Sequence, residues 1–549
     1  MSSVIKKIIS DALDEAIEEG SIKTKKPVIV ERPKKEGFGD FSTNIAMLLS
    51  PFEFQPARKL AAILIPKIEA SPVVSGCEAA GPGFINIFLE KSYWYALLKE
   101  MLKKGADYGN TDTGAGEKVQ VEFVSANPTG PLHIGHGRGA VVGDTLANIL
   151  KAAGYNVTKE YYINDAGVQV HTLGESVRLR YLELNGEKIV FPDGYYRGDY
   201  VKEIARDFSS MVSRLPGAQA VSTFQEFARE AMLERIKNDL KDFGVEFDIW
   251  YSEKERLRDS GLVESTIEEL EKRGFVYEEE GATWFRTTDF GDDKDRVLIK
   301  ADGELTYLAS DIAYHLDKIK RGFSSIINVW GADHHGYEAR VRALFKAFGH
   351  DERMLKIIFI QLVSLSRGGV AVAMGKREGE FVTLREVMDE VGKDAARFFF
   401  LMRKSDSQLP FDLELAKRQA PENPVYYVQY CHARIMSIME FATEKDIGLA
   451  GRPEDGVLEK LSLKEELDII RHLGAFEEII EKSALEMEPH RIAFYLQELA
   501  SLFHPYYNRN RVVSEDSVLT LARLFLCKAV AGVIRKGLGL IGVSAPVKM

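Results

Sequence analysis

An apolar run over residues 119–124 is followed by a turn rich in proline and glycine, and then by a helical pattern over roughly residues 140–152. The apolar residues of that pattern fall on one side: Val141, Leu146, Ile149 and Leu150. A strand, a tight turn and a helix in this order form a phosphate site in open α/β sheets, because the helix start presents unpaired N–H groups and a partial positive charge. The sequence therefore predicts a Rossmann-like parallel sheet with an anion site at its carboxyl edge.

Two histidines lie in this turn, in the run His133-Ile134-Gly135-His136. A lone histidine near a helix start is more often a cap or a surface residue than a functional group. Two of them around one glycine, between a strand and a helix, favour function. Imidazoles one turn apart add hydrogen-bond donors directed at one place, which suits a polyphosphate ligand.

The composition is that of a globular protein with several domains. Its 549 residues suggest roughly three to five domains. We find neither a signal peptide nor an apolar run long enough to cross a bilayer, so no membrane association is expected. Cys77, Cys431 and Cys527 are far apart and share no metal-ligand spacing. A cytoplasmic protein with no disulfide framework and no metal site is therefore expected.

The net charge of −11 argues against a protein that coats nucleic acid without discrimination. It is compatible with a selective RNA-binding protein, because local patches decide binding. Short basic clusters occur at residues 23–26, 32–35 and 509–511. Clusters this short are more often solvated faces than binding sites.

Changes of pattern divide the chain into successive units. Sheet-like runs at 297–299 and 325–330 resume after a long charged, helical segment, which predicts a parallel sheet split by an inserted domain. The predicted units are an α+β domain (1–110), the first half of the sheet domain (111–167), the insertion (168–290), the second half (291–370), a loop region (371–420) and an all-α bundle (421–549).

A predicted helix carries a candidate cation receptor. If the segment 303–315 is helical, Tyr307 and Asp311 stand one above the other. A carboxylate with a neighbouring phenol suits a guanidinium, whose planar fork matches a carboxylate in two parallel hydrogen bonds. Glu122, at the strand end beside the histidine turn, could supply a second carboxylate. The alternative for Asp311 is an exposed position on a helix face.

Two further stretches follow strand-like runs. The run 161–169, which contains Asn164 and Asp165, is interpreted as a strand that ends in an Asn-Asp turn. The run 329–337 contains Gly331, where a nucleoside could approach the backbone, and Asp333, which could bind ribose hydroxyls. Its His334-His335 pair could be read as a metal site, but three converging ligands are not evident, so the nucleotide interpretation is preferred.

The loop 372–381 carries two cations, Lys376 and Arg377, between glycines. A short loop of this kind could close over phosphates, although such a loop is otherwise unremarkable.

In this order and at these separations, the stretches resemble the class I aminoacyl-tRNA synthetases, and specifically the arginyl-tRNA synthetases of bacterial type, over the whole chain. The histidine run resembles the family's ATP signature, and Lys376 falls at the last lysine of its mobile KMSK loop. The segments 423–430 and 539–543 resemble the family's anticodon-binding helical domain. The segment 38–44 resembles its N-terminal domain, which contacts the tRNA.

The resemblance implies ATP-dependent ligation of L-arginine to tRNA(Arg) through an arginyl-adenylate, by a monomer with ATP as substrate, Mg²⁺ accompanying it and no tightly bound cofactor. It implies an ATP site of Pro131, Leu132, His133, Gly135, His136, Gly331, Asp333, Met374 and Lys376. It implies an arginine site of Glu122, Ser125, Asn127, Tyr307, Asp311 and His334. The implied catalytic groups are His133, His136 and Lys376.

The loop departs from the family pattern. Where Lys-Met-Ser-Lys is common, this chain has Ala373-Met374-Gly375-Lys376, and residues 127–132 contain no compensating lysine. We therefore take Arg377 as the candidate substitute for the missing phosphate-binding charge, as a fourth catalytic group.

For tRNA, tyrosines and basic residues of the helical domain are relevant, because unstacked loop bases pile onto aromatic rings. Tyr426, Tyr427, Tyr430, Tyr506 and Tyr507 are candidates, and about half are expected to be core residues instead. Tyr507 and Asn508 are the predicted anticodon-loop contacts.

Three rival functions are weighed against this one. Another class I synthetase is disfavoured, since selection of cysteine would call for zinc-binding cysteines and selection of an aliphatic residue would not call for Asp311 and Glu122. A small-molecule nucleotidyltransferase would not need the additional domains. A non-catalytic tRNA-binding paralogue gains some support from the altered loop.

Overall fold

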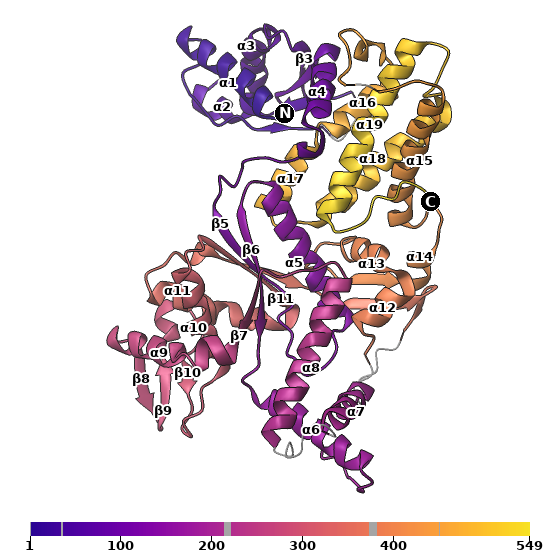
Figure 1. The fold of residues 1–549 in the computed structure, drawn as a ribbon. Helices are drawn as coiled ribbons and strands as arrows, with labels where there is room; N and C mark the ends of the chain where they lie inside the picture. Colours follow the sequence, from indigo (N-terminus) through magenta and orange to yellow (C-terminus); the bar gives the residue numbers. More distant parts are fainter. Residues whose placement is uncertain (1, 34–36, 213–220, 373–380, 450) are drawn as a thin grey trace.

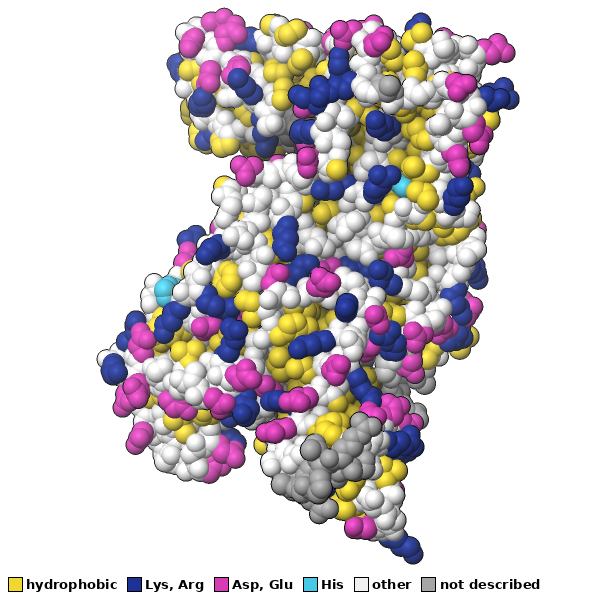
Figure 2. Space-filling model, in the orientation of Figure 1, with side chains coloured by type: hydrophobic (Ala, Val, Ile, Leu, Met, Phe, Trp, Pro, Cys, Tyr) yellow, Lys and Arg dark blue, Asp and Glu magenta, His cyan; other side chains and the backbone are white. Residues whose placement is uncertain are grey.

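The computed structural model describes the chain except residues 1, 34–36, 213–220, 373–380 and 450. An N-terminal unit and a helical bundle lie side by side at one end of the molecule, the parallel sheet lies in the middle, and inserted helices extend to the other end (Figure 1). Lys and Arg side chains are interspersed with Asp and Glu over the face shown in Figure 2. No single sign of charge dominates this face.

The N-terminal unit has the predicted α+β character. Its helices are α1 (Ser2–Glu18), α2 (Ile45–Glu53), α3 (Ala57–Glu69) and α4 (Lys91–Lys104). Its antiparallel sheet, in the order β1-β2-β4-β3, consists of β1 (Val30–Glu31), β2 (Phe41–Thr43), β3 (Val74–Ala80) and β4 (Phe84–Leu89). On α1, Ile5, Ile9 and Leu13 recur at helical spacing and are fully buried, which explains how this helix docks.

The central sheet has five parallel strands in the order β12-β11-β5-β6-β7. They are β5 (Lys118–Glu122), β6 (Asn156–Ile163), β7 (Ile249–Ser252), β11 (Ser325–Gly331) and β12 (Leu355–Ile360). The helices connected to them are α5 (Ile134–Ala152), α10 (Tyr307–Lys320) and α11 (Glu338–Ala347). The strands are largely apolar because helices cover the sheet. This confirms the predicted Rossmann-like fold class.

Two segments lie differently from the sequence-based expectation. The strand β7 falls within the predicted insertion 168–290, yet it pairs with β6 and completes the parallel sheet. Residues 297–299 belong to β10 (Arg296–Ile299), which joins β9 (Ala282–Phe285) and β8 (Val276–Glu279) in a separate antiparallel sheet. The assignment of 297–299 to the parallel sheet was therefore wrong. Short apolar runs do not reveal which sheet they join, because pairing is a tertiary choice.

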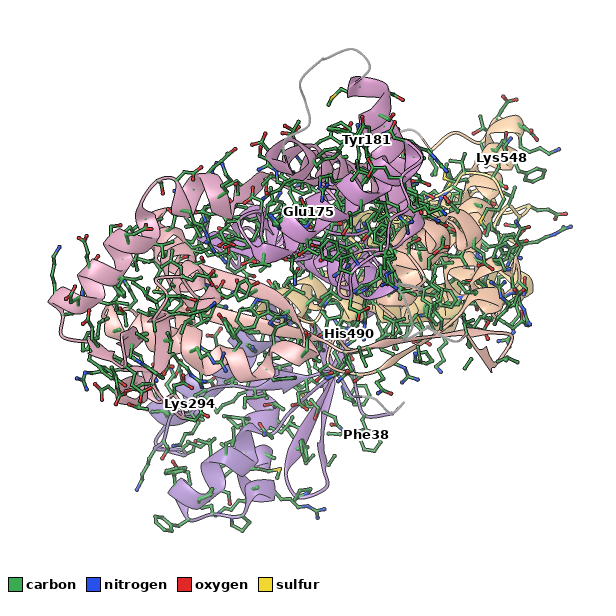
Figure 3. All side chains as sticks on the ribbon, turned by 90° about the horizontal axis from the view of Figure 1, so that it is seen from below. Phe38, Glu175, Tyr181, Lys294, His490 and Lys548 are labelled. Atoms are coloured by element: carbon green, nitrogen blue, oxygen red, sulfur yellow. The ribbon has the colours of Figure 1, made fainter. Side chains whose placement is uncertain are left out.

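The inserted helices are α6 (Val168–Leu184), α7 (Asp199–Val212) and α8 (Val221–Asp242), followed later by α9 (Leu262–Lys272). In Figure 3, Glu175 and Tyr181 of α6 lie on the opposite side of the molecule from Phe38 of the N-terminal unit. The insertion therefore extends away from the N-terminal unit, which Figure 1 also shows.

After β12 the chain forms a smaller sheet and three short helices. The strands are β13 (Val363–Arg367), β14 (Val370–Ala371) and β15 (Leu409–Asp412), and the helices are α12 (Leu384–Val391), α13 (Lys393–Phe400) and α14 (Leu413–Lys417). α12 and α13 pack against α5, so this region adjoins the histidine helix.

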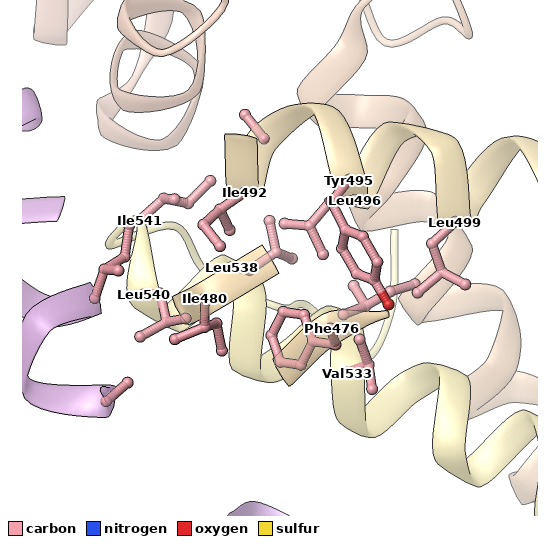
Figure 4. Close-up of a cluster of buried hydrophobic side chains, with 14 of the residues drawn as sticks. Phe476, Ile480, Ile492, Tyr495, Leu496, Leu499, Val533, Leu538, Leu540 and Ile541 are labelled. Atoms are coloured by element: carbon pink, nitrogen blue, oxygen red, sulfur yellow. The ribbon is translucent and has the colours of Figure 1, made fainter. Parts of the chain in front are cut away.

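The C-terminal part is the predicted helical bundle, with α15 (Pro424–Glu444), α16 (Lys464–Leu473), α17 (Phe476–Leu485), α18 (His490–Arg509) and α19 (Ser517–Leu540). Phe476, Tyr495 and Leu538 meet in its core (Figure 4). Among the described residues, α19 alone is long and apolar enough to cross a membrane, and 67% of its most apolar window is buried in the bundle. The expectation that no run reaches that length was wrong, since the core of a bundle demands the same composition.

Candidate active site

The carboxyl ends of β5, β6 and β11 meet at one edge of the sheet, and the predicted site residues cluster there. The backbone at Val124 and Ser125, just after β5, adopts positive φ angles of 69° and 41°. Two consecutive non-glycine residues in this region store strain, which is typical of functional sites. The hydroxyl of Ser125 accepts from the backbone N–H of Tyr162 and donates to Glu122 Oε1 at 2.9 Å. This turn ties β5 to β6 at the edge.

The histidine run forms the first turn of α5, because the helix begins at Ile134, six residues before the expected start. His133 is the N-cap, and its Nδ1 accepts from the N–H groups of Gly135 (3.0 Å) and His136 (3.3 Å). The Nδ1 of His136 accepts from the N–H of His133 at 3.3 Å. Because each Nδ1 accepts, each neutral ring carries its proton on Nε2.

The two imidazoles are stacked, with their centroids 3.6 Å apart. Burial lowers the pKa of His133, and it lowers the pKa of His136 to about 3. Both rings are therefore neutral donors near pH 7. They can hydrogen-bond to a phosphate without titrating in the physiological range.

The expected free N–H groups at the start of α5 are not available. Ile134 N–H donates to the carbonyl of Val382 at 3.2 Å, and the N–H groups of Gly135 and His136 are used by His133. The interpretation of this helix start as a direct N–H anion site was wrong, since the histidine cap satisfies the donors itself. The Nε2–H groups of the two imidazoles remain as donors.

Glu122 lies at the end of β5 and is almost fully buried, at 7% exposure. Its Oε2 accepts from the ammonium of Lys318 on α10 at 2.6 Å. The side chain of Lys318 is fully buried. Glu122 is therefore not a free second carboxylate, as the sequence suggested, but half of a buried ion pair.

Asp311 lies one turn from Tyr307 on α10, as predicted. Among the described residues it makes no ion pair. Burial raises the pKa of Asp311 to about 7, and the negative charges of Glu122 and Glu253 contribute to the increase. The buried hydroxyl of Tyr337 faces this carboxyl group and has no partner within hydrogen-bond geometry among the described residues. An acidic group without a counter-ion, near a buried phenol without a partner, suits a cationic ligand.

Two further residues of the predicted arginine site, Tyr307 and Asn127, lie beside the segment 164–169. Tyr307 is 57% exposed, and its hydroxyl lies beside Gly167. Asn127 donates from Nδ2 to Gln169 Oε1 at 2.7 Å. Asn164 has a buried Oδ1 without a partner, again beside Gly167.

The segment after β11 forms a short 3-10 helix, Ala332–Tyr337. The side chains of Asp333 and His334 are mostly exposed and lie 3.5 Å apart. A Cβ at Gly331 would come within 2.4 Å of Asp333 Oδ1, so a side chain there would require the exposed Asp333 carboxylate to shift. Among the described residues, no group of three or more His, Cys, Asp or Glu could hold a metal ion.

The predicted ATP-site residues Pro131 and Leu132 differ in solvent exposure. Pro131 is half-buried, whereas Leu132 is fully buried and accepts from Leu384 N–H through its carbonyl at 2.7 Å. Only the backbone of Leu132 is therefore available near the histidines. Met374, Lys376 and Arg377 lie outside the described residues.

Several functional candidates were missed by the sequence analysis. They are Lys318 and His315 on α10, Asn328 on β11, and Tyr337. Asp311, His315 and Lys318 recur at spacings of four and three on a helix that is otherwise mostly apolar. A polar stripe on an otherwise apolar helix predicts a buried polar site, and this pattern was present in the sequence.

In the helical bundle, Tyr507 is half-buried and Asn508 is exposed. The guanidinium of Arg434 lies over the rings of Tyr430 and Tyr507, at 4.6 and 4.8 Å. Tyr506 is a core residue whose hydroxyl donates to Glu466. Of the candidate tyrosines, Tyr430 and Tyr507 thus both contact Arg434, which the sequence did not predict as a site residue.

The parallel sheet, the histidine-capped helix and the helical bundle define a class I aminoacyl-tRNA synthetase. The family model of the class I (R) catalytic domain matches residues 97–412. A Mycobacterium tuberculosis methionyl-tRNA synthetase structure shares the fold, with a TM-score of 0.55 and 11% identity over 77% of this chain and 91% of that chain.

Narrower comparisons identify the family. The models of the arginyl-tRNA synthetase N-terminal domain and of the DALR anticodon-binding domain match residues 3–89 and 428–549. The arginine–tRNA ligase of Citrifermentans bemidjiense is 53% identical over 95% of this chain and 94% of that protein. That of Syntrophotalea carbinolica is 49% identical over the full length of both. The Thermus thermophilus arginyl-tRNA synthetase has the same fold, with a TM-score of 0.77 and 23% identity over all of both chains. The chain belongs to the arginyl-tRNA synthetase family.

Proposed function

We propose that this chain ligates L-arginine to tRNA(Arg) through an arginyl-adenylate and releases AMP and pyrophosphate. The overall reaction, ATP-dependent aminoacylation of tRNA with arginine, is that of its family. Arginine carboxylate attacks the α-phosphorus of ATP, and the terminal ribose of the tRNA then attacks the activated carbonyl. The protein contributes positioning and charge stabilisation to these displacements.

We assign the triphosphate to the two histidines. The Nε2–H groups of His133 and His136 donate to phosphate oxygens as charge moves onto pyrophosphate. Lys376 and Arg377 supply positive charge, and Gly135, Gly331 and Asp333 adjoin the nucleoside, as do Pro131, the backbone of Leu132 and Met374. Neutral donors suit this role, because they do not bind the ground-state polyanion as tightly as cations would.

We assign the arginine head to the acidic pocket. Asp311 takes the guanidinium in paired hydrogen bonds, and Glu122 and Tyr307 border it. Ser125, Asn127 and His334 lie toward the amino acid backbone. The observation that carries this assignment is the carboxyl of Asp311, which has no ion-pair partner among the described residues and lies within a network of buried polar groups.

The remaining partners follow from the substrates. Mg²⁺ enters with ATP, held by phosphate oxygens and water. The tRNA contacts the N-terminal unit, and its anticodon loop contacts Tyr507 and Asn508. We propose a cytoplasmic monomer. Its successive domains are 1–110, 111–167, 168–290, 291–370, 371–420 and 421–549. The strand β7 lies within the range 168–290 but belongs to the parallel sheet.

The test is ATP–pyrophosphate exchange with arginine, in the presence and absence of tRNA. Arginine-dependent exchange under either condition supports the proposal. Absence of exchange under both conditions would indicate a non-catalytic tRNA-binding paralogue, and exchange with another amino acid would indicate another class I synthetase.

A further inference from the structure

A continuous chain of buried hydrogen bonds connects the carboxylate of Glu122 with the backbone carbonyl of Asp311, and so joins the two residues proposed to bind the arginine head. The ammonium of Lys318 donates to Glu122 Oε2 at 2.6 Å and to Asn328 Oδ1 at 3.0 Å. Asn328 lies opposite Glu122 on the neighbouring strand. Its Nδ2 is 2.8 Å from His315 Nε2, and His315 Nδ1 is 2.8 Å from the carbonyl of Asp311.

The direction of each bond in this chain is determined. Because Asn328 Oδ1 accepts from Lys318, its Nδ2 donates to His315 Nε2. His315 then carries its proton on Nδ1 and donates it to the carbonyl of Asp311. Burial lowers the pKa of His315, which keeps the ring neutral as this arrangement requires. A network with every member satisfied fixes its geometry.

Two of the three carboxylates around the pocket are paired with cations. Glu253, which also acts on Asp311, is paired with Arg258 at 2.8 Å. Glu122 is paired with Lys318. Of these three carboxylates, Asp311 is the one without an ion-pair partner among the described residues. A monocation of the guanidinium type would supply that partner.

We propose that Lys318 is a positioning residue for arginine: its ammonium pairs with the carboxylate of Glu122 and holds it in place, so that the pocket matches one guanidinium. This inference rests on the proposed roles of Glu122 and Asp311 in arginine binding. Without Lys318, the buried carboxylate of Glu122 would lack a counter-ion, and burial disfavours the charged form of such a group. Lys318 would act through Glu122 and would not touch the substrate.

The experiment is a double-mutant cycle of Glu122→Gln and Lys318→Met in the full chain, with KM for arginine and for ATP measured by pyrophosphate exchange (tRNA present). We expect each single variant to raise the arginine KM about tenfold or more at pH 7, with the ATP KM nearly unchanged. The double variant should be no worse than Glu122→Gln, since the two residues act as one unit. Lys320→Met, an exposed lysine on the same helix, is the matched control.

A pH series separates positioning from a merely structural role. In Lys318→Met the arginine KM should approach the wild-type value as the pH is raised, because burial without a counter-ion disfavours the charged form of a carboxylate. The double variant should lack this recovery. The other titratable groups facing Glu122 are common to all variants: Asp311 and Tyr314 of α10, and Tyr162 and Glu160 of β6. If Lys318→Met does not fold, Lys318→Gln keeps N–H donors without the charge and carries the same expectation.

Two results would overturn the role of Lys318 while leaving the proposed arginine site in place. One is a ratio of arginine KM between Lys318→Met and the wild type that does not change with pH. The other is an increase in arginine KM from Lys318→Met that adds to the increase from Glu122→Gln in the double variant. An unchanged arginine KM in Glu122→Gln would instead remove Glu122 from the arginine site, and the inference would fall with it.

Discussion

Asp311 is the residue on which arginine recognition depends most directly. We expect Asp311→Asn to weaken arginine binding by about 2–3 kcal/mol, or roughly 30- to 150-fold in KM, because a charged hydrogen-bond partner is lost. The KM for ATP should remain nearly unchanged. Steady-state exchange kinetics measure both values, and an equal loss for both substrates would point to misfolding.

The pKa of the same carboxyl predicts a pH dependence. It is raised to about 7 in the free protein, so below pH 7 the group is mostly protonated and must lose its proton when a guanidinium binds. The arginine KM should therefore rise about tenfold from pH 8 to pH 6, and the rise should vanish in Asp311→Asn. His136 of the proposed phosphate site does not titrate in this range, since its pKa is about 3.

Arg377 carries the hypothesis about the altered loop. If it replaces the missing lysine, Arg377→Ala should slow adenylate formation by roughly 10²-fold or more, because a cation that stabilises the transition state is removed. Rapid-quench measurement of the first turnover would test this. A single-turnover rate equal to that of the wild type would contradict the hypothesis.

At the scale of elements, the first turn of α5 combines two functions in one side chain. His133 caps the helix through Nδ1 and presents Nε2–H to the site. His133→Asn should keep the cap, because asparagine is a good N-cap, but should lose the phosphate donor. We expect unchanged thermal stability and an exchange rate lowered by roughly 10²-fold or more.

The comparison variant His133→Ala removes both functions. It should add a loss of about 1 kcal/mol in unfolding free energy to the loss of rate. Full exchange activity in His133→Asn would show that capping is the only role of this residue.

Helix α10 shows which structural features can be predicted from the sequence of a single helix. Its helical character and the Tyr307–Asp311 spacing were predicted from residue pattern, because both depend on contacts within one turn. The pairing of Glu122 with Lys318 spans 196 residues of sequence. No local pattern indicates that partner, since only the packing of α10 over β5 and β11 brings the two together.

At the scale of the whole molecule, Arg397 of α13 connects three parts of the chain. Fully buried, it pairs with Asp144 of α5 and donates to the carbonyls of Ile541 (2.8 Å) and Phe243 (3.0 Å). A Cβ at Gly542 would strike its guanidinium, so glycine is required there. Arg397 thus joins the histidine helix, the end of the insertion and the C-terminal segment.

Arg397→Met should lower the free energy of unfolding by about 3 kcal/mol or more, since it leaves buried carbonyls without donors and removes a charge partner of Asp144. Denaturant unfolding measures the change, with Arg403→Met, at an exposed position, as the control. Equal stability of the two variants would mean that solvent replaces these contacts.

The sequence by itself determined the class of fold, the order of its units and the positions of the motif residues, because periodicity and turn chemistry are local properties. It could not assign β7 and β10 to their sheets, nor show that the start of α5 is capped by its own histidine. Nor did it reveal that one of the two pocket carboxylates is already paired. These features depend on contacts between distant segments, and only tertiary packing decides which buried polar groups meet and which one is left for the substrate.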